Sequence, residues 1–300
     1  MTSYSFIIPS FNSAKDLMTC VRSLNSLKYN KRKYEIIIVD DGSTDQSTSQ
    51  IKRLNIANLK IYKNPKQGAA AARNYGIEKA KKNILIFLDQ DVSVKENLLN
   101  IYDSALKITG ADAVQGNIWK QLINTELTKT HATWRKIVFI NKVNDHDGFI
   151  KTIVTRNVAI KKEVLNKILR KDGYIFDEKF KGTGGEDREL GYRINKLGFN
   201  IYLEPQAIVK HKDPDKLLGI LIQKYKHARG DVKLGIGEKF YDISNFKRVV
   251  INPLGSGVPL YFSFLIWCFH IAGCEIERAK QKLIIISNGI FSRNHSPRGF

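Results

Sequence analysis

The sequence predicts an α/β protein, with a mixed but mostly parallel sheet flanked by helices and a helical, apolar C-terminal extension. First, apolar runs of strand length alternate with helical patterns through the first hundred residues, which is typical of parallel strands joined by right-handed crossovers. Second, the runs EIIIVD (35–40) and ILIFLD (84–89) are apolar almost throughout, as expected of strands covered on both faces. Third, 43% of the 300 residues are hydrophobic, which is enough to build a core.

The elements of the first half follow from periodicity. Positions 17, 21, 24 and 27 are all apolar and lie on one face of a helix over 14–27. Short apolar runs predict the strands, and helical patterns fill the gaps between them. We expect strands at 4–9, 34–41, 59–64 and 83–91, and helices at 14–27, 44–54 and 68–82.

The second half is more mixed in its patterns. A helix opens at about residue 186 and ends at Gly198, since glycine commonly follows the last helical turn. A basic helix and then an apolar stretch follow residue 212. We expect strands at 111–119, 152–160 and 200–205, and further helices at 161–169 and 214–229.

Charge and cysteine content narrow the classes of partner. The net charge of +20 attracts any polyanion, including nucleic acid, anionic lipid and phosphorylated substrates. No zinc-finger or RNA-binding aromatic signature is present, so nucleic acid is disfavoured. Cys20, Cys268 and Cys274 are too few and too far apart for a disulfide scaffold or a zinc knuckle. With no signal-peptide pattern at the start, we expect a cytoplasmic protein.

Polar residues follow three of the predicted parallel strands. They are Pro9-Ser10-Phe11 with Asn12, the pair Asp40-Asp41, and Asp89-Gln90-Asp91. In open parallel sheets, ligands bind beyond the carboxyl ends of the strands, so these groups should converge. Two aspartates separated by one residue point to the same side and can hold a hard divalent cation.

The segment VDDGSTDQ (39–46) contains two kinds of acid. Ser43 and Gln46 match a capping box, so a helix start is the favoured reading for Ser43 and Asp45. Asp40 and Asp41 instead end a buried apolar strand, where an unpaired carboxylate is costly. They can accept a hydrogen bond from the imide N–H of a pyrimidine base or from a ribose hydroxyl.

Two further segments are open to more than one reading. In GAAAARNYG (68–76), small residues let the helix approach a ligand closely, and Arg73 can reach a diphosphate or can be an exposed helix charge. In GTGGEDRELGYR (182–193), Glu186 and Asp187 are either an acidic helix start or a site where a carboxylate meets a substrate. Glu189 and Arg193 are spaced as an i, i+4 ion pair and need only a structural role.

Six motifs in order give the chain a family resemblance. They are FIIPSFN (6–12), IIIVDDGSTD (36–45), GAAAARNYG (68–76), FLDQD (87–91), FDEKFKGTGGEDRELGYR (176–193) and the strand leading to His211. Together they resemble the inverting glycosyltransferases of family 2, which have the GT-A fold. The resemblance implies a nucleotide-sugar donor, usually a UDP-sugar. It also implies a donor-binding half at 1–95, an acceptor and catalytic half at 96–212, and an extension at 213–300.

The resemblance also implies a role for each matching residue. Asp187 is implied as the catalytic base, with Glu186 positioning acceptor or donor hydroxyls. The implied metal ligands for Mn²⁺ or Mg²⁺ are Asp91, His211 and Asp89. The implied donor-binding residues are Pro9, Ser10 and Phe11 around the base, Asp41 on the base with Asp40 beside it, Gly68 and Arg73 on the diphosphate side, and Asp89 and Gln90 near the ribose.

Two features depart from the family pattern. Many members have a glycine two residues before the asparagine of the acceptor-side strand, whereas this chain has Thr155-Arg156-Asn157. Arg156 would then face a charged acceptor. The aromatic loop that usually precedes the Glu–Asp pair is replaced by a glycine-rich segment, so acceptor stacking on an aromatic ring is not evident there.

The tail over 249–286 allows three readings: a membrane-inserted or interfacial helix, a homodimer interface, or a buried docking helix. VPLYFSFLIWCFHIAGC (258–274) is apolar on all faces and slightly short for a membrane span of about 20 residues. The flanking Lys247, Arg248, Arg278, Lys280 and Lys282 favour the inner face of the cell membrane and a lipid-linked or cell-envelope glycan acceptor. The competing functions are a nucleotidyltransferase and a non-catalytic sugar-nucleotide-binding module.

Overall fold

A computed structural model describes residues 2–122, 125–140, 147–182, 184–235, 250 and 257–293. The chain divides into two compact units. The first, called the sheet unit below, comprises Met1–Gly182 with Glu186–Asp215. The second, called the helical unit, comprises Thr183–Gly185 with Lys216–Phe300.

The sheet unit is built on one mixed sheet, with the strand order β3-β2-β1-β4-β8-β6-β9-β5 and with β7 paired to β9. The strands β3, β2, β1 and β4 are mutually parallel, β8 is antiparallel to β4 and β6, and β6 is parallel to β9. The predicted mostly parallel α/β fold is confirmed. The strands are β1 (Tyr4–Ser10), β2 (Tyr34–Asp40), β3 (Leu59–Lys63), β4 (Ile84–Leu88), β5 (Val92–Val94), β6 (Ala113–Gln121), β7 (Phe149–Ile150), β8 (Asn157–Lys161) and β9 (Ile201–His211).

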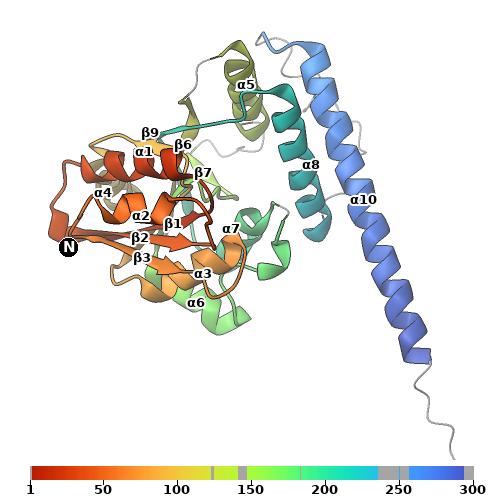
Figure 1. Ribbon diagram of the computed structural model, residues 1–300, viewed down its shortest axis with the longest axis horizontal. Coiled ribbons are helices and arrows are strands. Elements are labelled where there is room, and N and C mark those ends of the chain that lie inside the picture. The colour runs from red at the N-terminus through yellow and green to blue at the C-terminus, as the bar shows by residue number, and fades with distance from the viewer. Residues whose placement is uncertain are drawn as a thin grey trace, which may run out of the picture. The chain divides into compact units, whose positions relative to one another are not determined.

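Helices cover both faces of this sheet, and the strands are apolar on both sides as a result (Figure 1). One core cluster joins Phe6 and Ile8 to helices α1 (Ala14–Asn25), α2 (Ser47–Lys52) and α4 (Leu98–Thr109). The other joins the intervening Ile7 to helices α3 (Ala69–Lys79), α6 (Lys162–Asp172) and α7 (Glu186–Lys196). Alternate residues of one strand therefore anchor opposite layers, which fixes the strand register.

The topology places a switch point beside β1. Because β1 pairs with β2 on one side and with β4 on the other, the crossover from β3 through α3 returns across the first strand. The carboxyl ends of β1, β2 and β4 then lie at one edge of the sheet. This edge is the expected place for a ligand in a doubly wound sheet.

Some predicted elements differ from those observed. The helix expected at 44–54 begins only at Ser47 and lacks the predicted capping box, because Ser43 Oγ accepts the backbone N–H of Asn12 at 3.0 Å instead. The strand expected at 152–160 begins at Asn157. The elements α4, β5, β7 and α5 (Glu126–Ile140) were not expected from the sequence.

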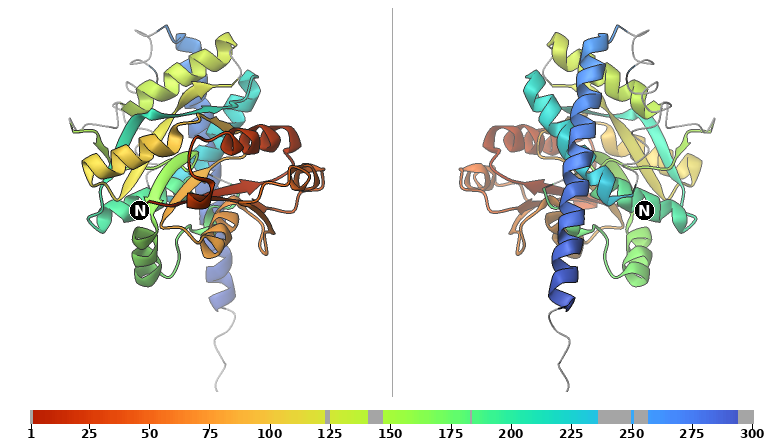
Figure 2. Two further views of the ribbon diagram at one scale, coloured as in Figure 1. Left: turned by 90° about the vertical axis from the view of Figure 1, so that its left-hand side faces the viewer. Right: turned by 90° about the vertical axis from the view of Figure 1, so that its right-hand side faces the viewer.

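The helical unit contains α8 (Leu217–Lys233) and the long helix α10 (Leu260–Arg293), which lie side by side (Figure 2). Arg229 pairs with Glu277 at 2.8 Å, and His270 Nε2 lies 3.2 Å from Asp231 Oδ2, so polar groups are matched between the two helices. The predicted apolar helical extension is confirmed.

One stretch of α10, Leu260–Lys282, is long and apolar enough to cross a membrane, with 39% of its most apolar window buried. The core helix of a soluble protein can be equally long and apolar, so length and composition alone are weak evidence that α10 spans a membrane. The flanking residues Lys247 and Arg248 lie outside the described residues.

Candidate active site

The ends of β1 and β4 are tied together by one glutamine. Gln90 Oε1 accepts the backbone N–H of Phe11 at 2.9 Å, and Gln90 Nε2 donates to the Phe11 carbonyl at 3.2 Å. The end of β2 joins the same edge, because the Asp41 N–H donates to the Ser10 carbonyl at 2.8 Å. The ring of Phe11 remains 52% exposed, and the buried hydroxyl of Ser10 has no hydrogen-bond partner among the described residues. The three predicted strand ends therefore do meet.

Asp41 links β2 to the start of α3. Its carboxylate accepts the backbone N–H of Gly68 at 2.9 and 3.0 Å and the side-chain amide of Asn64 at 2.6 Å. Gly68 adopts φ +121°, which favours glycine and turns its N–H toward the acid. Asp40 accepts the backbone N–H of Ser43 at 3.1 Å and so shapes the next loop. The sequence analysis did not single out Asn64.

Asp89, Asp91 and His211 form a set with the composition of a metal site. Their candidate ligand atoms all lie within 4.8 Å of one another, and His211 Nε2 is 3.2 Å from Asp91 Oδ2. Burial alone would raise the pKa of Asp91, but the hydrogen bond and charge of His211 outweigh it and hold that pKa below its usual range. Asp91 Oδ1 is buried without a described partner. An unpaired buried carboxylate oxygen is costly, so this arrangement fits a bound divalent cation.

Behind His211 lies a buried polar cluster that the sequence analysis did not predict. His211 Nδ1 is 2.8 Å from Oδ1 of Asp213, which is only 2% exposed. Arg135 Nη2 lies 2.5 Å from Asp213 Oδ2 and Arg156 Nη1 3.9 Å from Oδ1. Burial would raise the pKa of Asp213, but hydrogen bonds from His131 and His211 and the charge of Arg135 hold it well below its usual range.

Arg156 lies inside this cluster, with Nε 3.7 Å from Asp89 Oδ2, and is 9% exposed. The predicted role of Arg156 toward a charged acceptor is not tested by these contacts.

Arg73 joins Asp89 to Glu186. Its guanidinium is 2.9 Å from Glu186 Oε1 and 3.1 Å from Asp89 Oδ1, and the side chain is only 5% exposed. The alternative that Arg73 is an exposed helix charge is therefore wrong. Burial and the neighbouring charge of Asp187 raise the pKa of Glu186, and Arg73 opposes them. The guanidinium holds Glu186 in place at the start of α7.

Asp187 is differently engaged. Its Oδ1 accepts the backbone N–H of Arg188 at 2.8 Å, and the side chain is partly buried. The preceding glycines have backbone conformations that favour glycine, with φ +73° at Gly182 and +120° at Gly185. In the helical unit, Gly184 packs against α8 so closely that a Cβ on Gly230 would lie 1.4 Å from its carbonyl oxygen. The glycines of this segment are therefore explained by positive φ angles at Gly182 and Gly185 and by the close contact of Gly184 with α8.

The sheet order and these side chains define a class of protein. A parallel half-sheet with its switch point at β1, a D-x-D–His set and an acidic helix start at the same edge are features of glycosyltransferases of the GT-A fold. Residues 5–169 match the family model described as Glycosyl transferase family 2. The chain belongs to this family.

Two relatives illustrate the match to named glycosyltransferases. Glycosyltransferase AglE of Haloferax volcanii is 39% identical over 117 residues, which cover 38% of this chain and 38% of AglE. A dolichyl N-acetyl-α-D-glucosaminyl phosphate 3-β-D-2,3-diacetamido-2,3-dideoxy-β-D-glucuronosyltransferase of Methanococcus voltae is 26% identical over 215 residues, covering 69% of this chain and 66% of that enzyme. The chain thus matches less than two thirds of the length of either relative.

Solved structures share the fold at low sequence identity. TarS of Staphylococcus aureus, residues 1–349, aligns with a TM-score of 0.56 and 17% identity, covering 93% of this chain and 91% of that one. The mannosyltransferase PcManGT of Pyrobaculum calidifontis, solved with GDP-Man and Mn²⁺, aligns with a TM-score of 0.60 and 15% identity, covering 99% and 81%. TarS has also been solved with UDP-GlcNAc.

Proposed function

We propose that this protein is a metal-dependent inverting glycosyltransferase that moves a sugar from a nucleotide-sugar, most simply a UDP-sugar, to an acceptor hydroxyl. One observation carries the proposal. The Asp89–Asp91–His211 set and the Glu186–Asp187 pair meet through Arg73 at the carboxyl edge of the sheet. This contact supports a single site for donor-side and acceptor-side chemistry.

The nucleotide end of the donor would lie over the end of β1 and β2. The exposed ring of Phe11 offers a face for a base, and the unpartnered Ser10 hydroxyl offers a hydrogen bond. Asp41 is held by Gly68 and Asn64, and its remaining lone pairs can accept from a uracil imide or a ribose hydroxyl. In this arrangement residues 1–95 bind the donor and residues 96–212 supply the acceptor side.

Asp89, Asp91 and His211 would hold Mn²⁺ or Mg²⁺, and two carboxylates with one imidazole suit Mn²⁺ well. When bound, the cation acts as a Lewis acid that neutralises charge on the leaving diphosphate. Arg73 orients Asp89 from the other side through its 3.1 Å contact. It would act on the diphosphate through Asp89, because its guanidinium is buried between two acids.

The two acids at the start of α7 would have different roles, one in positioning hydroxyls and the other as the general base. Glu186 is held by Arg73 at 2.9 Å, which suits a group that positions hydroxyls. Asp187 accepts the backbone N–H of Arg188 through Oδ1, so its second oxygen can accept a proton. We therefore assign the general base to Asp187, which would take the proton of the acceptor hydroxyl as the new glycosidic bond forms.

The acceptor is proposed to be a glycan or a lipid-linked saccharide in polysaccharide or cell-envelope synthesis. In the helical unit, Leu260, Tyr261 and Phe264 of α10 are exposed, as are Leu218 and Ile222 of α8. Exposed apolar side chains beside basic residues suit peripheral binding at the inner face of a membrane. Liposome flotation of the full-length chain tests this: binding to anionic vesicles that is lost in a Tyr261→Ser, Phe264→Ser variant supports it. If the protein instead forms a salt-resistant homodimer and does not bind vesicles, membrane binding is contradicted, and the tail is better explained as a homodimer interface.

A donor panel tests the proposed reaction. Purified protein is incubated with UDP- and GDP-linked sugars, with Mn²⁺ or with EDTA, and release of the nucleoside diphosphate is measured. We expect release from one donor that requires the metal. Pyrophosphate release would instead support a nucleotidyltransferase, although SFNSAKD (10–16) lacks the glycine-rich basic loop of that class. Donor binding without any turnover, across acceptors, would support the non-catalytic module.

A further inference from the structure

Asp213 is a buried acid that none of the steps above uses. It lies two residues beyond the end of β9, in the sheet unit, and is 2% exposed. Both of its oxygens are engaged, Oδ1 by His211 and Oδ2 by side chains of α5. A fully desolvated carboxylate costs stability unless its partners compensate, so its place requires an explanation.

The two nitrogens of His211 face two different carboxylates. Nδ1 lies 2.8 Å from Asp213 Oδ1, and Nε2 lies 3.2 Å from Asp91 Oδ2. A carboxylate can only accept, so Nδ1 must carry a hydrogen and donate it to Asp213. By the same rule, Nε2 donates to Asp91 while it carries a hydrogen. If that hydrogen is given up to a cation, Nδ1 can keep its bond to Asp213 and the lone pair of Nε2 then faces the D-x-D side.

Asp213 is in turn anchored from α5 and β8. Arg135 Nη2 is 2.5 Å and His131 Nδ1 3.4 Å from Asp213 Oδ2, and both side chains come from α5. Arg156, the residue that precedes β8, is 3.9 Å away on the Oδ1 side. These contacts surround the Asp213 carboxylate with cationic and imidazole groups, and its Oδ1 lies 2.8 Å from Nδ1 of His211.

We propose that Asp213 is a positioning residue of the metal centre, which orients His211 and directs its Nε2 to a divalent cation held with Asp89 and Asp91. This inference rests on the metal site of the proposed function. Carboxylates that accept from a ligating histidine fix the ring and strengthen it as a ligand. Helix α5, which does not contact the D-x-D itself in any described ion pair, would then help to build the metal centre through Asp213.

A purely structural role is the alternative. Asp213 would then only neutralise Arg135 and Arg156, and the metal affinity would not depend on where its carboxylate lies. Two substitutions separate the readings. Asp213→Asn keeps the shape and removes the charge, whereas Asp213→Glu keeps the charge and displaces the carboxylate by one methylene group.

The experiment measures Mn²⁺ affinity by electron paramagnetic resonance and the melting temperature of each variant, without substrate. We expect Asp213→Asn to weaken Mn²⁺ binding about 10- to 100-fold, the usual loss for such a partner of a ligating histidine. Asp213→Glu should also weaken it, although the charge is retained. Asp215→Asn is the matched control, because it removes an exposed acid two residues away and should leave the affinity unchanged.

A double-mutant cycle with His211→Ala completes the test. If Asp213 acts through His211, Asp213→Asn has no further effect on Mn²⁺ affinity once His211 is removed. Unchanged affinity in both Asp213 variants, or losses that multiply in the double variant, would overturn the inference. If the unsubstituted protein binds no Mn²⁺, the proposed metal site itself fails, which is a distinct result.

Discussion

The two edges of the parallel half-sheet contain acids that are used in opposite ways. At the amino edge, Glu35 is 7% exposed, and its Oε1 accepts from Ser5 Oγ and from the backbone N–H of Lys81, both at 2.7 Å. At the carboxyl edge, Asp91 retains a buried oxygen without a described partner, and Asp187 Oδ1 accepts the backbone N–H of the next residue, Arg188. Both edges bury carboxylates, and the two sets differ in how fully their hydrogen bonds are satisfied.

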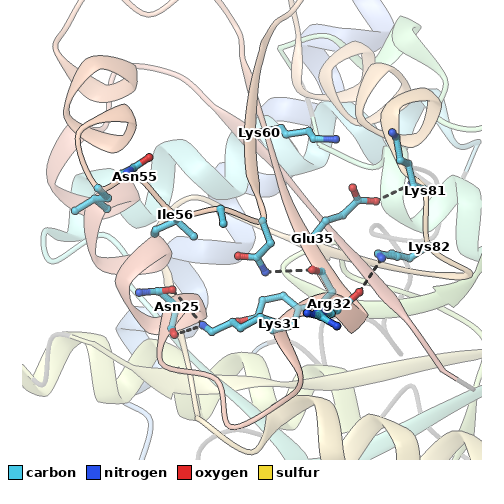
Figure 3. A pocket seen from close by; sticks show the side chains of 13 residues that line it. Asn25, Lys31, Arg32, Glu35, Asn55, Ile56, Lys60, Lys81 and Lys82 are labelled. Carbon is cyan, nitrogen blue, oxygen red and sulfur yellow. Dashed lines mark hydrogen bonds between the residues drawn. The ribbon is translucent and has the colours of Figure 1, made fainter.

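The amino edge also has a cavity of about 630 Å³, shown in Figure 3. Two of its basic side chains bond to neighbouring groups: Lys31 Nζ donates to the carbonyl of Asn25 and, at 3.1 Å, to its side chain, and Lys82 Nζ donates to the Arg32 carbonyl at 3.0 Å. A cavity and a cluster of positive charge are therefore not enough to identify a reaction site. Carboxylates with unused acceptor capacity, held in place by buried arginines, are the feature that distinguishes the carboxyl edge.

The largest effect is expected at Asp187. Asp187→Asn should reduce kcat by about 10²- to 10⁴-fold, the range for loss of a general base. Donor affinity and melting temperature should be unchanged, because the described carboxylate contact is a single hydrogen bond to Arg188 N–H. Steady-state kinetics with calorimetric donor binding provide the check. Normal turnover by the Asn variant would show that Asp187 is not the general base.

Arg73 should affect both stability and activity. Arg73→Gln leaves Glu186 and Asp89 without their shared cation, and we expect a loss of about 3 kcal/mol, at the low end for a broken buried pair, because Asp89 is 31% exposed. Transfer should fall as well, since both acids lose their orientation. Chemical denaturation measures the first effect. Arg32→Gln at the amino edge is the matched control, and an equal loss there would contradict the comparison.

Substitution of Glu35 should lower stability and leave activity unchanged, which is the reverse of the effect expected at Asp187. Glu35→Gln weakens the hydrogen bonds from Ser5 and Lys81, so the free energy of unfolding should fall by about 1–3 kcal/mol. We expect kcat/KM to be unchanged below the melting transition. A variant of normal stability with impaired transfer would show that the amino edge takes part in the reaction.

Lys60 should give the smallest effect. It lines the amino-edge cavity, is exposed, and extends from β3. Lys60→Ala should change the free energy of unfolding by less than about 0.5 kcal/mol, as is usual for surface substitutions. Donor affinity should not change either. A marked loss of donor or acceptor binding would mean that this cavity is a second site.

Much of the fold was predictable because its signals are local. The apolar run YSFIIP identifies β1 within one residue, and ILIFLD identifies β4, although β4 ends at Leu88 rather than at residue 91. His211 is the last residue of β9, which extends six residues beyond the strand expected at 200–205. The capping box at Ser43 failed because a distant residue, Asn12, competes for the same hydroxyl. Local propensity cannot register such a competitor.

The unpredicted parts of the site depend on long-range contacts. Asp213 gains its importance from Arg135 and His131 of α5, about 80 residues earlier in the chain, and no spacing rule connects them. Arg73 is similar, since its partners Asp89 and Glu186 come from two other elements. Helix α4 could have been found, because Leu98, Tyr102 and Ala105 recur at helical spacing.

The most direct test of the account is calorimetric binding of UDP and UDP-sugars to the unsubstituted protein and to Asp91→Asn, each with Mn²⁺ and with EDTA. We expect the unsubstituted protein to bind one of these nucleotides more tightly with Mn²⁺, and Asp91→Asn to lose this gain while folding normally. Equal affinity in all four conditions, or metal-dependent binding that survives in Asp91→Asn, would contradict a metal-dependent nucleotide site at the carboxyl edge.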